Sequence, residues 1–257
     1  MTQDQPASRV NENTRWEKLP CPVCGSESFE ALFEKRGEPF VRCRGCSLIM
    51  INPRPHYDDI ITTYNSEYGN LYLNKKAKKL RRIRPWVKKI KSNYVSGGRW
   101  LDIGCSVGFV VYCAKEAGFD AYGVDVEPHG LKVAREQLGL TNIYQGMLEG
   151  QGFADGYFNV ISLYDVIEHV PDLNAFVREL KRLLAPGGII DLRTPDAGHW
   201  RVPKQLDQWN AILPSEHLYN FSFGNLRLLL KNNGLEVVQK RLNFKPILNV
   251  YAGHEQM

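Results

Sequence analysis

The chain has 257 residues, of which 43% are apolar and 24% are charged, with 22 glycines, 14 prolines and a formal net charge of +5. This composition is typical of a folded protein with a sizeable core, and it excludes a collagen, a coiled coil and a disordered chain. The best apolar stretches, 107–114 and 157–164, have 8 residues each, whereas a membrane-spanning helix needs roughly 20. We therefore expect no transmembrane segment.

The N-terminal residues, MTQDQPASRV, contain no basic segment followed by an apolar one, so they do not have the pattern of a secretory signal. We expect a cytoplasmic, reducing location, where disulfides are rare and grouped cysteines more often bind metal. Four of the six cysteines form two C-x2-C pairs with 18 residues between them. This spacing is typical of a four-thiolate zinc site, with the ligands Cys21, Cys24, Cys43 and Cys46.

The short segments between the two cysteine pairs suit the hairpin of a zinc ribbon, which we place at residues 15–55. They are too few to build a core alone, so a structural zinc ion would supply the missing stability. The alternative interpretation is four unrelated buried thiols. Cys105 and Cys113 have no partners of this kind, and we expect them to be small buried apolar residues.

A strongly basic segment follows, because residues 75–91 hold ten Lys and Arg and no acid. The rest of the chain therefore has 33 − 10 = 23 basic and 28 acidic residues, a net charge of −5. Leu80, Ile83, Val87 and Ile90 recur at helical spacing, which predicts an amphipathic helix that is bent or restarted at Pro85. Its cationic face could bind an anionic partner, such as a nucleotide-sugar, a phospholipid surface or RNA, or simply be solvated.

From residue 99 the pattern is a short buried strand, a turn of small residues, a helix over 107–117 and a second strand ending in acids. Strand, glycine turn, helix and strand make up the first half of a nucleotide-binding α/β unit. In such units an acid about 20 residues beyond the first glycine of the turn binds ribose hydroxyls. Asp125 lies 21 residues beyond Gly104, so we expect it to bind ribose.

The turn Gly104-Cys105-Ser106-Val107-Gly108 has three chemical interpretations. A dinucleotide site is disfavoured, because Phe109 stands where a third small residue belongs and Asp102 would face pyrophosphate. A hydrolase nucleophile at Ser106 would need several strands before it and an oxyanion segment, and the chain offers neither. The third interpretation, a site for a cationic ligand facing Asp102, agrees best with the residues.

The segments LDIGCSVG, YGVDVEP, YFNVISLYDVIEHV and LLAPGGIIDLRTPD together resemble the successive motifs of class I S-adenosylmethionine-dependent methyltransferases. The resemblance covers the chain from about residue 99 to the C-terminus. It implies that Asp102 positions the amino group of the cofactor, that the glycine turn passes beneath the cofactor, and that Asp125 holds the ribose. The cofactor-binding set that it implies is Asp102, Gly104, Ser106, Gly108, Asp125, Val126, Met147, Leu148, Tyr164 and Tyr68.

Two positions depart from the family pattern. Ser106 replaces a more usual glycine, and Met147 cannot accept a hydrogen bond from the adenine amino group. That contact would then fall to Gln145, Glu149 or the backbone. The N-terminal half also resembles the ribbon and helical cover of many bacterial methyltransferases, which implies a cover at 56–95 that brings Tyr64 and Tyr68 toward the methionyl end.

The expected fold is α/β, a Rossmann-like seven-stranded methyltransferase sheet over residues 96–257 with helices on both faces. The third to fifth strands are expected at 142–145, 158–164 and 188–194, and a closing hairpin follows. Asp172 is the expected N-cap of a helix over 173–184, and Ser222 that of a helix over 224–232.

Methyl transfer needs alignment of the acceptor and, for a hydroxyl of high pKa, a base. The candidates are His217, His169 at the end of the fourth strand, and Asp165. His217 follows a long irregular segment whose aromatic residues could form an apolar wall, and we expect it to be a proton acceptor that titrates near neutral pH. Each histidine could instead hold a loop by hydrogen bonds. The expected acceptor is a small molecule, anionic or phosphate-bearing, with a hydroxyl on a sugar, nucleotide-linked sugar or specialised metabolite. An RNA base methyltransferase is a less favoured alternative, and a binding module without catalysis is the third.

Overall fold

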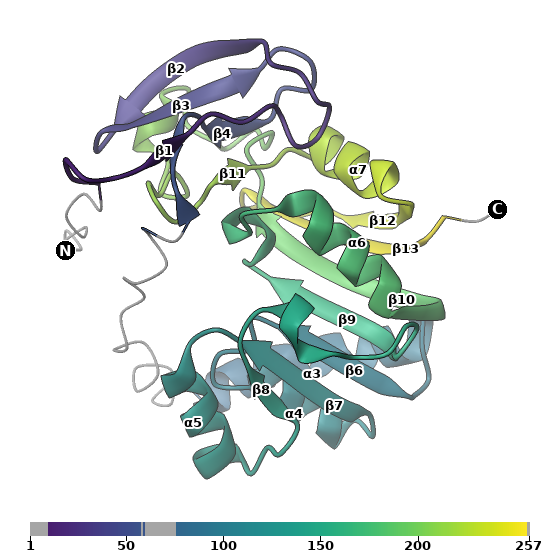
Figure 1. Ribbon diagram of the computed structural model, residues 1–257. Helices are drawn as coiled ribbons and strands as arrows, with labels where there is room; N and C mark the ends of the chain where they lie inside the picture. Colours follow the sequence, from purple (N-terminus) through teal and green to yellow (C-terminus); the bar gives the residue numbers. More distant parts are fainter. Residues whose placement is uncertain (1–9, 58, 60–75, 256–257) are drawn as a thin grey trace.

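A computed structural model describes residues 10–57, 59 and 76–255 (Figure 1). Two sheets dominate it, a large one in the middle of the molecule and a small one near the N-terminus. Tyr64 and Tyr68 lie outside the described residues, so the expected approach of these side chains to the cofactor stays a prediction.

The large sheet has seven strands in the order β12-β13-β10-β9-β6-β7-β8, which confirms the expected methyltransferase fold. Strands β6 to β10 run parallel to one another, and β13 is antiparallel to both β10 and β12. The chain leaves β6 toward β7 and later returns on its other side with β9, so the strand order reverses at β6. The bounds are β6 (Arg99–Ile103), β7 (Asp120–Asp125), β8 (Ile143–Gln145), β9 (Phe158–Tyr164), β10 (Leu184–Pro195), β12 (Leu235–Arg241) and β13 (Ile247–His254).

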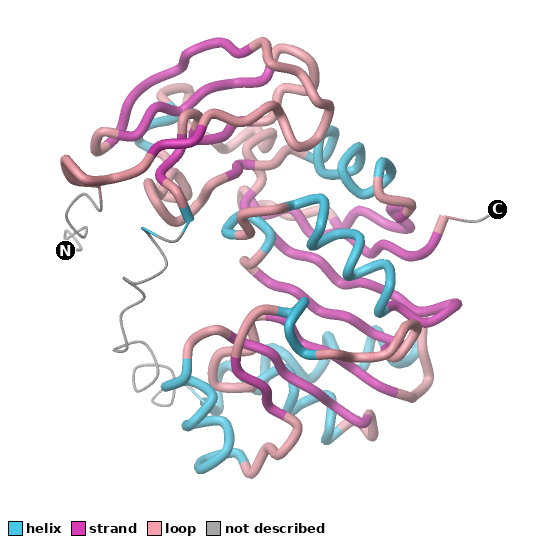
Figure 2. The backbone as a smooth tube through the Cα atoms, viewed as in Figure 1, coloured by secondary structure: helices cyan, strands magenta, loops and turns pink. Residues whose placement is uncertain are grey.

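Alternating residues of the central strands face two separate cores, because neighbouring side chains in a strand point to opposite faces. Trp100, Val160 and Ile189 pack in one cluster, and the residues that follow each of them pack in the other. The first face is covered by α3 (Lys76–Asn93), α4 (Phe109–Glu116) and α5 (Pro128–Leu138). The second is covered by α6 (Leu173–Leu183) and α7 (Phe223–Asn232) (Figure 2).

The small sheet is antiparallel, and it contains the hairpin expected between the two cysteine pairs. Its strands are β2 (Phe29–Lys35), β3 (Glu38–Cys43), β4 (Ile49–Ile51) and β11 (Tyr219–Asn220), in the order β11-β4-β3-β2. β11 comes from the C-terminal half of the chain, so the ribbon is completed by a distant segment. A two-stranded sheet, β1 (Trp16–Glu17) with β5 (Arg54–Pro55), flanks it.

The helix ends follow the expected capping chemistry. Asp172 accepts a hydrogen bond from the backbone N–H of Ala175 at 2.9 Å, and Ser222 forms a capping box with Asn225. α3 continues through Pro85. Of the two outcomes expected at this proline, a bend or a restart, the restart is therefore wrong. Tertiary packing accounts for this, since α3 buries Leu80, Val87 and Ile90 against the sheet on both sides of the proline. No helix among the described residues is long and apolar enough to cross a membrane.

Candidate active site

The glycine turn lies at the carboxyl end of β6, next to the point where the strand order reverses. Ligands of open α/β sheets bind at this place. Gly104 has φ +69° and is exposed, and a Cβ there would lie 2.5 Å from Val166 Cγ2. Gly108 has φ +76°, which ends the turn and makes α4 begin at Phe109 instead of at 107. Ser106 also has a positive φ, of 49°, a conformation that glycine adopts more easily. The backbone at Gly104, where the turn begins, is thus exposed.

Asp102 lies beneath this turn and is only 3% exposed. Its Oδ1 accepts a hydrogen bond from the hydroxyl of Ser162 at 2.6 Å. Burial raises the pKa of Asp102 to about 7, because the charged carboxylate loses its hydration. A cationic ligand at this position would stabilise the charged form.

Asp125 ends β7, and both of its oxygens bind backbone. Oδ2 accepts from the N–H of Ser106 at 2.7 Å, and Oδ1 accepts from the N–H of Glu127 at 2.8 Å. The first bond fixes the glycine turn to the second strand. Because each carboxylate oxygen can accept two hydrogen bonds, the half-buried Asp125 can still accept from ligand hydroxyls. The neighbouring Val126 is half-buried as well.

Met147 and Leu148 follow β8, where η1 (Leu148–Gln151) begins. The backbone N–H of Gly146 donates to Asp125 O at 2.9 Å, so this segment lies beside the end of β7. Met147 is 38% exposed and Leu148 is buried. Met147 and Leu148 thus follow directly on the residue that binds the end of β7, and their contact with a cofactor stays a prediction.

Tyr164 ends β9 and faces the α3 side of the sheet. Its hydroxyl donates to Asp191 Oδ2 at 2.8 Å, and its ring stacks on Trp86 with the centroids 4.6 Å apart. Asp191 also pairs with Arg241 at 2.7 Å. Trp86 thereby gives the basic helix an apolar contact with the end of β9, which the charge pattern alone does not predict.

The two candidate histidines lie together. His169 belongs to η2 (Ile167–His169), directly after β9, and His217 directly precedes Leu218 and β11. Their ring centroids are 4.7 Å apart with the rings nearly perpendicular. Glu168 joins them, and one ligand atom from each of the three residues lies within 4.8 Å of the others. Sequence analysis missed Glu168 as a site residue, although its place beside His169 at the end of a strand was a usable signal.

His217 differs from the proton acceptor that the sequence predicts. It is 8% exposed, and burial, together with the neighbouring His169, lowers its pKa to about 3. The expectation that His217 titrates near neutral pH is therefore wrong, because its ring is buried. Asp165 is exposed and forms an ion pair with Arg193.

The long connection between β10 and β11 packs partly on the ribbon. It therefore does not line a substrate site along its whole length. Trp209 and Ile212 are buried against Phe40, Ile49 and Ile51. Within this connection, η3 (Leu206–Gln208) is one short helical turn, and Trp200 is 74% exposed. Sequence analysis assigned these aromatics to an apolar wall, and for Trp209 the ribbon explains the burial.

Glu38 links the ribbon to the histidines. Its side chain, buried in β3, accepts hydrogen bonds from the backbone N–H of Ser215 at 2.8 Å and from the hydroxyl of Ser215. Ser215 lies two residues before His217. In addition, the backbone N–H of Ile51 donates to Leu218 O at 3.2 Å. The ribbon therefore holds the chain on both sides of His217, at Ser215 and at Leu218.

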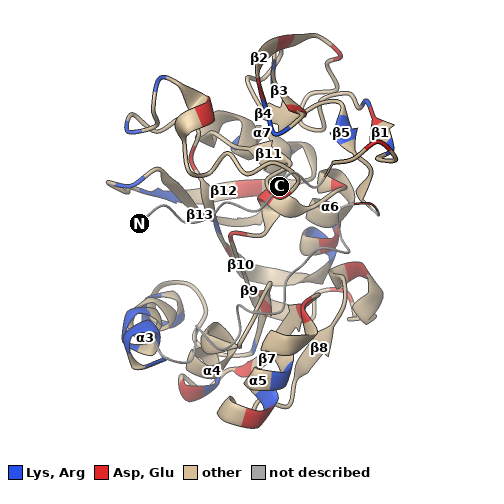
Figure 3. Cartoon of the chain, turned by 90° about the vertical axis from the view of Figure 1, so that its left-hand side faces the viewer, with Lys and Arg blue, Asp and Glu red and all other residues tan. Residues whose placement is uncertain are grey.

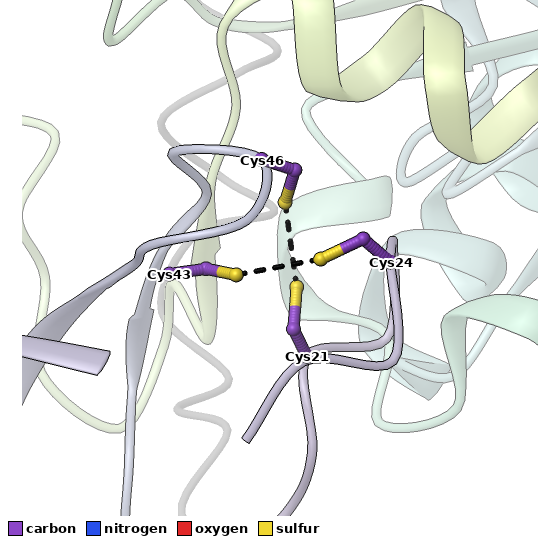
Figure 4. Close-up of side chains that lie close together, drawn as sticks. All are labelled: Cys21, Cys24, Cys43 and Cys46. Atoms are coloured by element: carbon purple, nitrogen blue, oxygen red, sulfur yellow. Dashed lines mark hydrogen bonds between the residues drawn. The ribbon is translucent and has the colours of Figure 1, made fainter. Parts of the chain in front are cut away.

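The four cysteines of the two pairs converge on one point (Figure 4). The Sγ atoms of Cys21 and Cys46 are 3.4 Å apart, as are those of Cys24 and Cys43. These separations are too long for disulfide bonds and close to the roughly 3.8 Å between ligands of a tetrahedral zinc ion with bonds of about 2.3 Å. The geometry therefore fits a four-coordinate metal. Cys105 and Cys113 are buried in the core elsewhere, as expected.

Replacing Asp102 by Asn should stabilise the ligand-free protein. Folding raises the pKa of this carboxyl from about 4 to about 7. The burial of Asp102 therefore lowers the free energy of unfolding by an amount that grows from pH 4 to pH 7 and stays constant above pH 7. We expect Asp102→Asn to raise Tm by about 3–8 °C at pH 8, with the gain shrinking toward pH 4. Differential scanning calorimetry at both pH values tests this, and an equal or lower Tm at pH 8 would contradict the burial argument.

Comparison with known proteins agrees with this geometry. A family model described as a methyltransferase domain matches residues 73–240, which is more than half of the chain. The chain is 29% identical over 170 residues to a ubiquinone biosynthesis O-methyltransferase of Cereibacter sphaeroides, covering 59% of this chain and 66% of that protein. It is 33% identical over 106 residues to a protein of the same name from Methylococcus capsulatus, covering 39% and 44%.

The chain thus spans less than two thirds of the length of these curated relatives. Among solved structures, an S-adenosylmethionine-dependent methyltransferase from Clostridium acetobutylicum has a TM-score of 0.57 at 13% identity, covering 75% of this chain and 100% of that one. The PH0226 protein of Pyrococcus horikoshii has a TM-score of 0.55 at 18% identity, covering 70% and 91%. These two likenesses concern the fold. The chain belongs to the methyltransferase domain family.

Proposed function

We propose that the protein transfers the methyl group of S-adenosylmethionine to a hydroxyl oxygen of a small organic acceptor. The proposal rests on one observation, the cluster of Glu168, His169 and His217 at the sheet edge that also holds Asp102 and Asp125. Neutral imidazoles and a carboxyl group at this edge can orient an acceptor hydroxyl by hydrogen bonds. The names of the relatives, which are O-methyltransferases, support the same reaction.

The residues at the glycine turn suit the cofactor. Asp102 would face its ammonium group, the bare backbone at Gly104 would pass beneath it, and Asp125 would accept from its ribose hydroxyls. The raised pKa of Asp102 supports this arrangement, since a bound cation would offset the burial of the carboxylate. We place the remaining proposed contacts around the adenine and the methionyl end: Gly108, Ser106, Val126, Met147, Leu148, Tyr164 and Tyr68.

The chemistry is an in-line displacement. The acceptor oxygen forms a bond to the methyl carbon while the bond from that carbon to sulfur breaks, and the electron pair goes to sulfur. The hydroxyl proton leaves to a nearby base or to water. Because the sulfonium is already a good leaving group, the chain mainly supplies alignment. His217 and His169 are the proposed orienting groups, with Asp165 as a further proton acceptor.

Cofactor binding provides a direct test. S-adenosylmethionine should raise Tm and NAD should not, because a ligand of the folded state stabilises it by mass action. We expect Asp125→Ala to weaken binding by about 1.5–3 kcal/mol, which is roughly 10-fold to 150-fold in Kd, through loss of a charge-assisted contact. Isothermal titration calorimetry measures this change.

Asp120→Ala is the matched control for this variant. Asp120 begins the same strand, and its side chain binds Tyr122 and Asn142 at the opposite end of the sheet. Its replacement should leave the affinity for S-adenosylmethionine unchanged. If Asp125→Ala bound the cofactor as tightly as Asp120→Ala does, Asp125 would not belong to the site.

The acceptor that we favour is a sugar, a nucleotide-linked sugar or a specialised metabolite. The alternative, an RNA base, is suggested by the basic residues of α3, which lie on its outward side (Figure 3). An RNA that engages 6–10 phosphates should lose about 10³–10⁵ in affinity between 50 and 200 mM salt. Weak RNA binding with a shallow salt dependence, together with turnover in a metabolite screen, would exclude that alternative.

The same proposal assigns a structural zinc ion to Cys21, Cys24, Cys43 and Cys46. Four thiolates would leave no coordination position for water or substrate. We also propose the division into ribbon (15–55), helical cover (56–95) and methyltransferase domain (96–257), with β11 added to the ribbon sheet by the third part. Elemental analysis of protein purified without added metal should find one zinc per four-cysteine cluster.

A further inference from the structure

A row of polar side chains crosses the middle of the large sheet, with one residue on each of β6, β9, β10 and β13. The strand register pairs Asp102 with Ser162, Ser162 with Asp191, and Asp191 with Tyr251. Residues that oppose one another in neighbouring strands point to the same face of a sheet. This row faces α3, because Trp100, two positions before Asp102, packs in the core on that side. Two aspartates are thus buried on one face of the sheet, with a serine between them.

The two aspartates differ in their partners. Asp191 Oδ1 lies 2.7 Å from Nη2 of Arg241, and its Oδ2 accepts from the hydroxyl of Tyr164 at 2.8 Å. Asp102 forms no ion pair with any residue that the structure describes, and its hydrogen bond within this part of the chain is the one from Ser162. A buried charge without an opposite charge destabilises a fold. The complementary charge for Asp102 is therefore that of a bound ligand.

The surroundings of Asp102 supply no spare positive charge. The titratable and charged groups that face it are Asp125 of β7, Tyr164 of β9, Asp191 and Arg193 of β10, and Cys105 of the glycine turn. Arg193, the cation of this set, is already paired with Asp165. Burial raises the pKa of the Cys105 thiol and of the Tyr164 hydroxyl well above their usual values, so both groups are neutral.

The hydroxyl of Ser162 has a fixed direction. The indole N–H of Trp100 donates to Ser162 Oγ at 2.8 Å, and both side chains are fully buried. Because an indole can only donate, Oγ accepts from Trp100 and directs its own proton to another acceptor. Two acceptors lie within reach, Asp102 Oδ1 at 2.6 Å and Leu101 O at 3.3 Å. The shorter, charge-assisted bond is the stronger, so the donors run from Trp100 through Ser162 to Asp102.

We propose that Ser162, oriented by Trp100, is a positioning residue of the cofactor site, which holds the Asp102 carboxylate in its ionised form and leaves Oδ2 to bind the ammonium group of the cofactor. The proposal rests on the proposed function and specifies one of its cofactor contacts. Ser162 itself touches neither the cofactor nor the acceptor in this scheme. It acts through Asp102.

This arrangement couples cofactor binding to a proton. Burial raises the pKa of Asp102 in the ligand-free protein to about 7, and a cation bound beside the carboxylate lowers it again. Below about pH 7, each cofactor that binds should therefore displace most of one proton from Asp102 to solvent. The bond from Ser162 also favours the charged form, so loss of this hydroxyl should raise the pKa of Asp102.

Calorimetric titration with S-adenosylmethionine between pH 5.5 and 7.5, in buffers of different ionisation heat, measures both the affinity and the proton release. The wild type should bind about 10-fold to 30-fold more weakly at pH 5.5 than at pH 7.5. Ser162→Ala should move the midpoint of this dependence up by about 1 pH unit and weaken binding at pH 7 by about 5-fold to 10-fold. Trp100→Phe should shift it in the same direction by less. Ser162→Thr, which keeps the hydroxyl, should restore the wild-type midpoint.

Two matched variants serve as controls. Tyr219→Phe removes another buried hydroxyl, which donates to Pro171 O in the region of the small sheet. His199→Ala removes a histidine of the connection between β10 and β11, which is bonded to Asn243. Both variants should keep the wild-type affinity and midpoint.

The outcomes separate this inference from the proposed function. A purely structural role of Ser162 would lower Tm without moving the midpoint, and an unmoved midpoint in Ser162→Ala, or in Trp100→Phe if Ser162→Ala does not fold, overturns the inference. A wild-type pH dependence in Asp102→Asn would remove Asp102 from the site, and the inference with it. If the midpoints move as expected and no hydroxyl acceptor is methylated, the proposed function fails while the inference stands.

Discussion

Cys43→Ser should lose the bound zinc and, with it, most turnover. Metal binding typically stabilises small zinc domains by about 10–16 kcal/mol relative to the unfolded apo form, so removal of one ligand should unfold the ribbon. The ribbon holds the segment before β11 through Glu38 and Ser215. Its loss should therefore displace His217, whereas Asp102 and Asp125 lie on strands of the separate, larger sheet. We expect turnover to fall more than affinity for S-adenosylmethionine.

Cys113→Ser is the matched control, because Cys113 is a buried thiol in α4 outside the cluster. It should retain the full zinc content. Zinc by mass spectrometry, turnover, and limited proteolysis of the ribbon should be measured on both variants. Full zinc content and an unchanged Tm in Cys43→Ser would show that the cysteines do not hold a stabilising ion.

His217→Ala should reduce turnover by about 10²–10⁴ and leave the affinity for S-adenosylmethionine nearly intact. The reason is its place beside Glu168 and His169, on the side of the site that we assign to the acceptor. His217 has its pKa lowered to about 3 by burial, so it is neutral throughout the neutral pH range. Its protonation should not produce a rise in turnover near the pH of about 6.5 at which an ordinary histidine titrates.

Steady-state kinetics from pH 5 to 9, with cofactor binding measured in parallel, test this expectation. His199→Ala again serves as the control and should keep turnover within about twofold of the wild type. Normal turnover in His217→Ala, or loss of cofactor binding, would assign His217 a structural role. The acceptor-side function would then pass to His169 or Asp165.

The sequence by itself determined the features that depend on neighbouring residues. Local periodicity and spacing predict the strand, turn and helix around Gly104 and the acid at Asp125. Spacing likewise predicts the cluster of the two C-x2-C pairs. β9 has the expected bounds, and the caps at Asp172 and Ser222 are present, because each depends on a few consecutive residues. Hydrophobic pattern and backbone chemistry were sufficient for the fold class.

Tertiary structure decided the features that depend on distant segments. β11 joins the ribbon sheet, Glu38 binds Ser215 across 177 positions, and α3 continues through Pro85 because it packs on the sheet. The low pKa of His217 was likewise decided by burial, which no local pattern reports. Burial depends on the closure of long loops, so it appears only when the whole chain is folded.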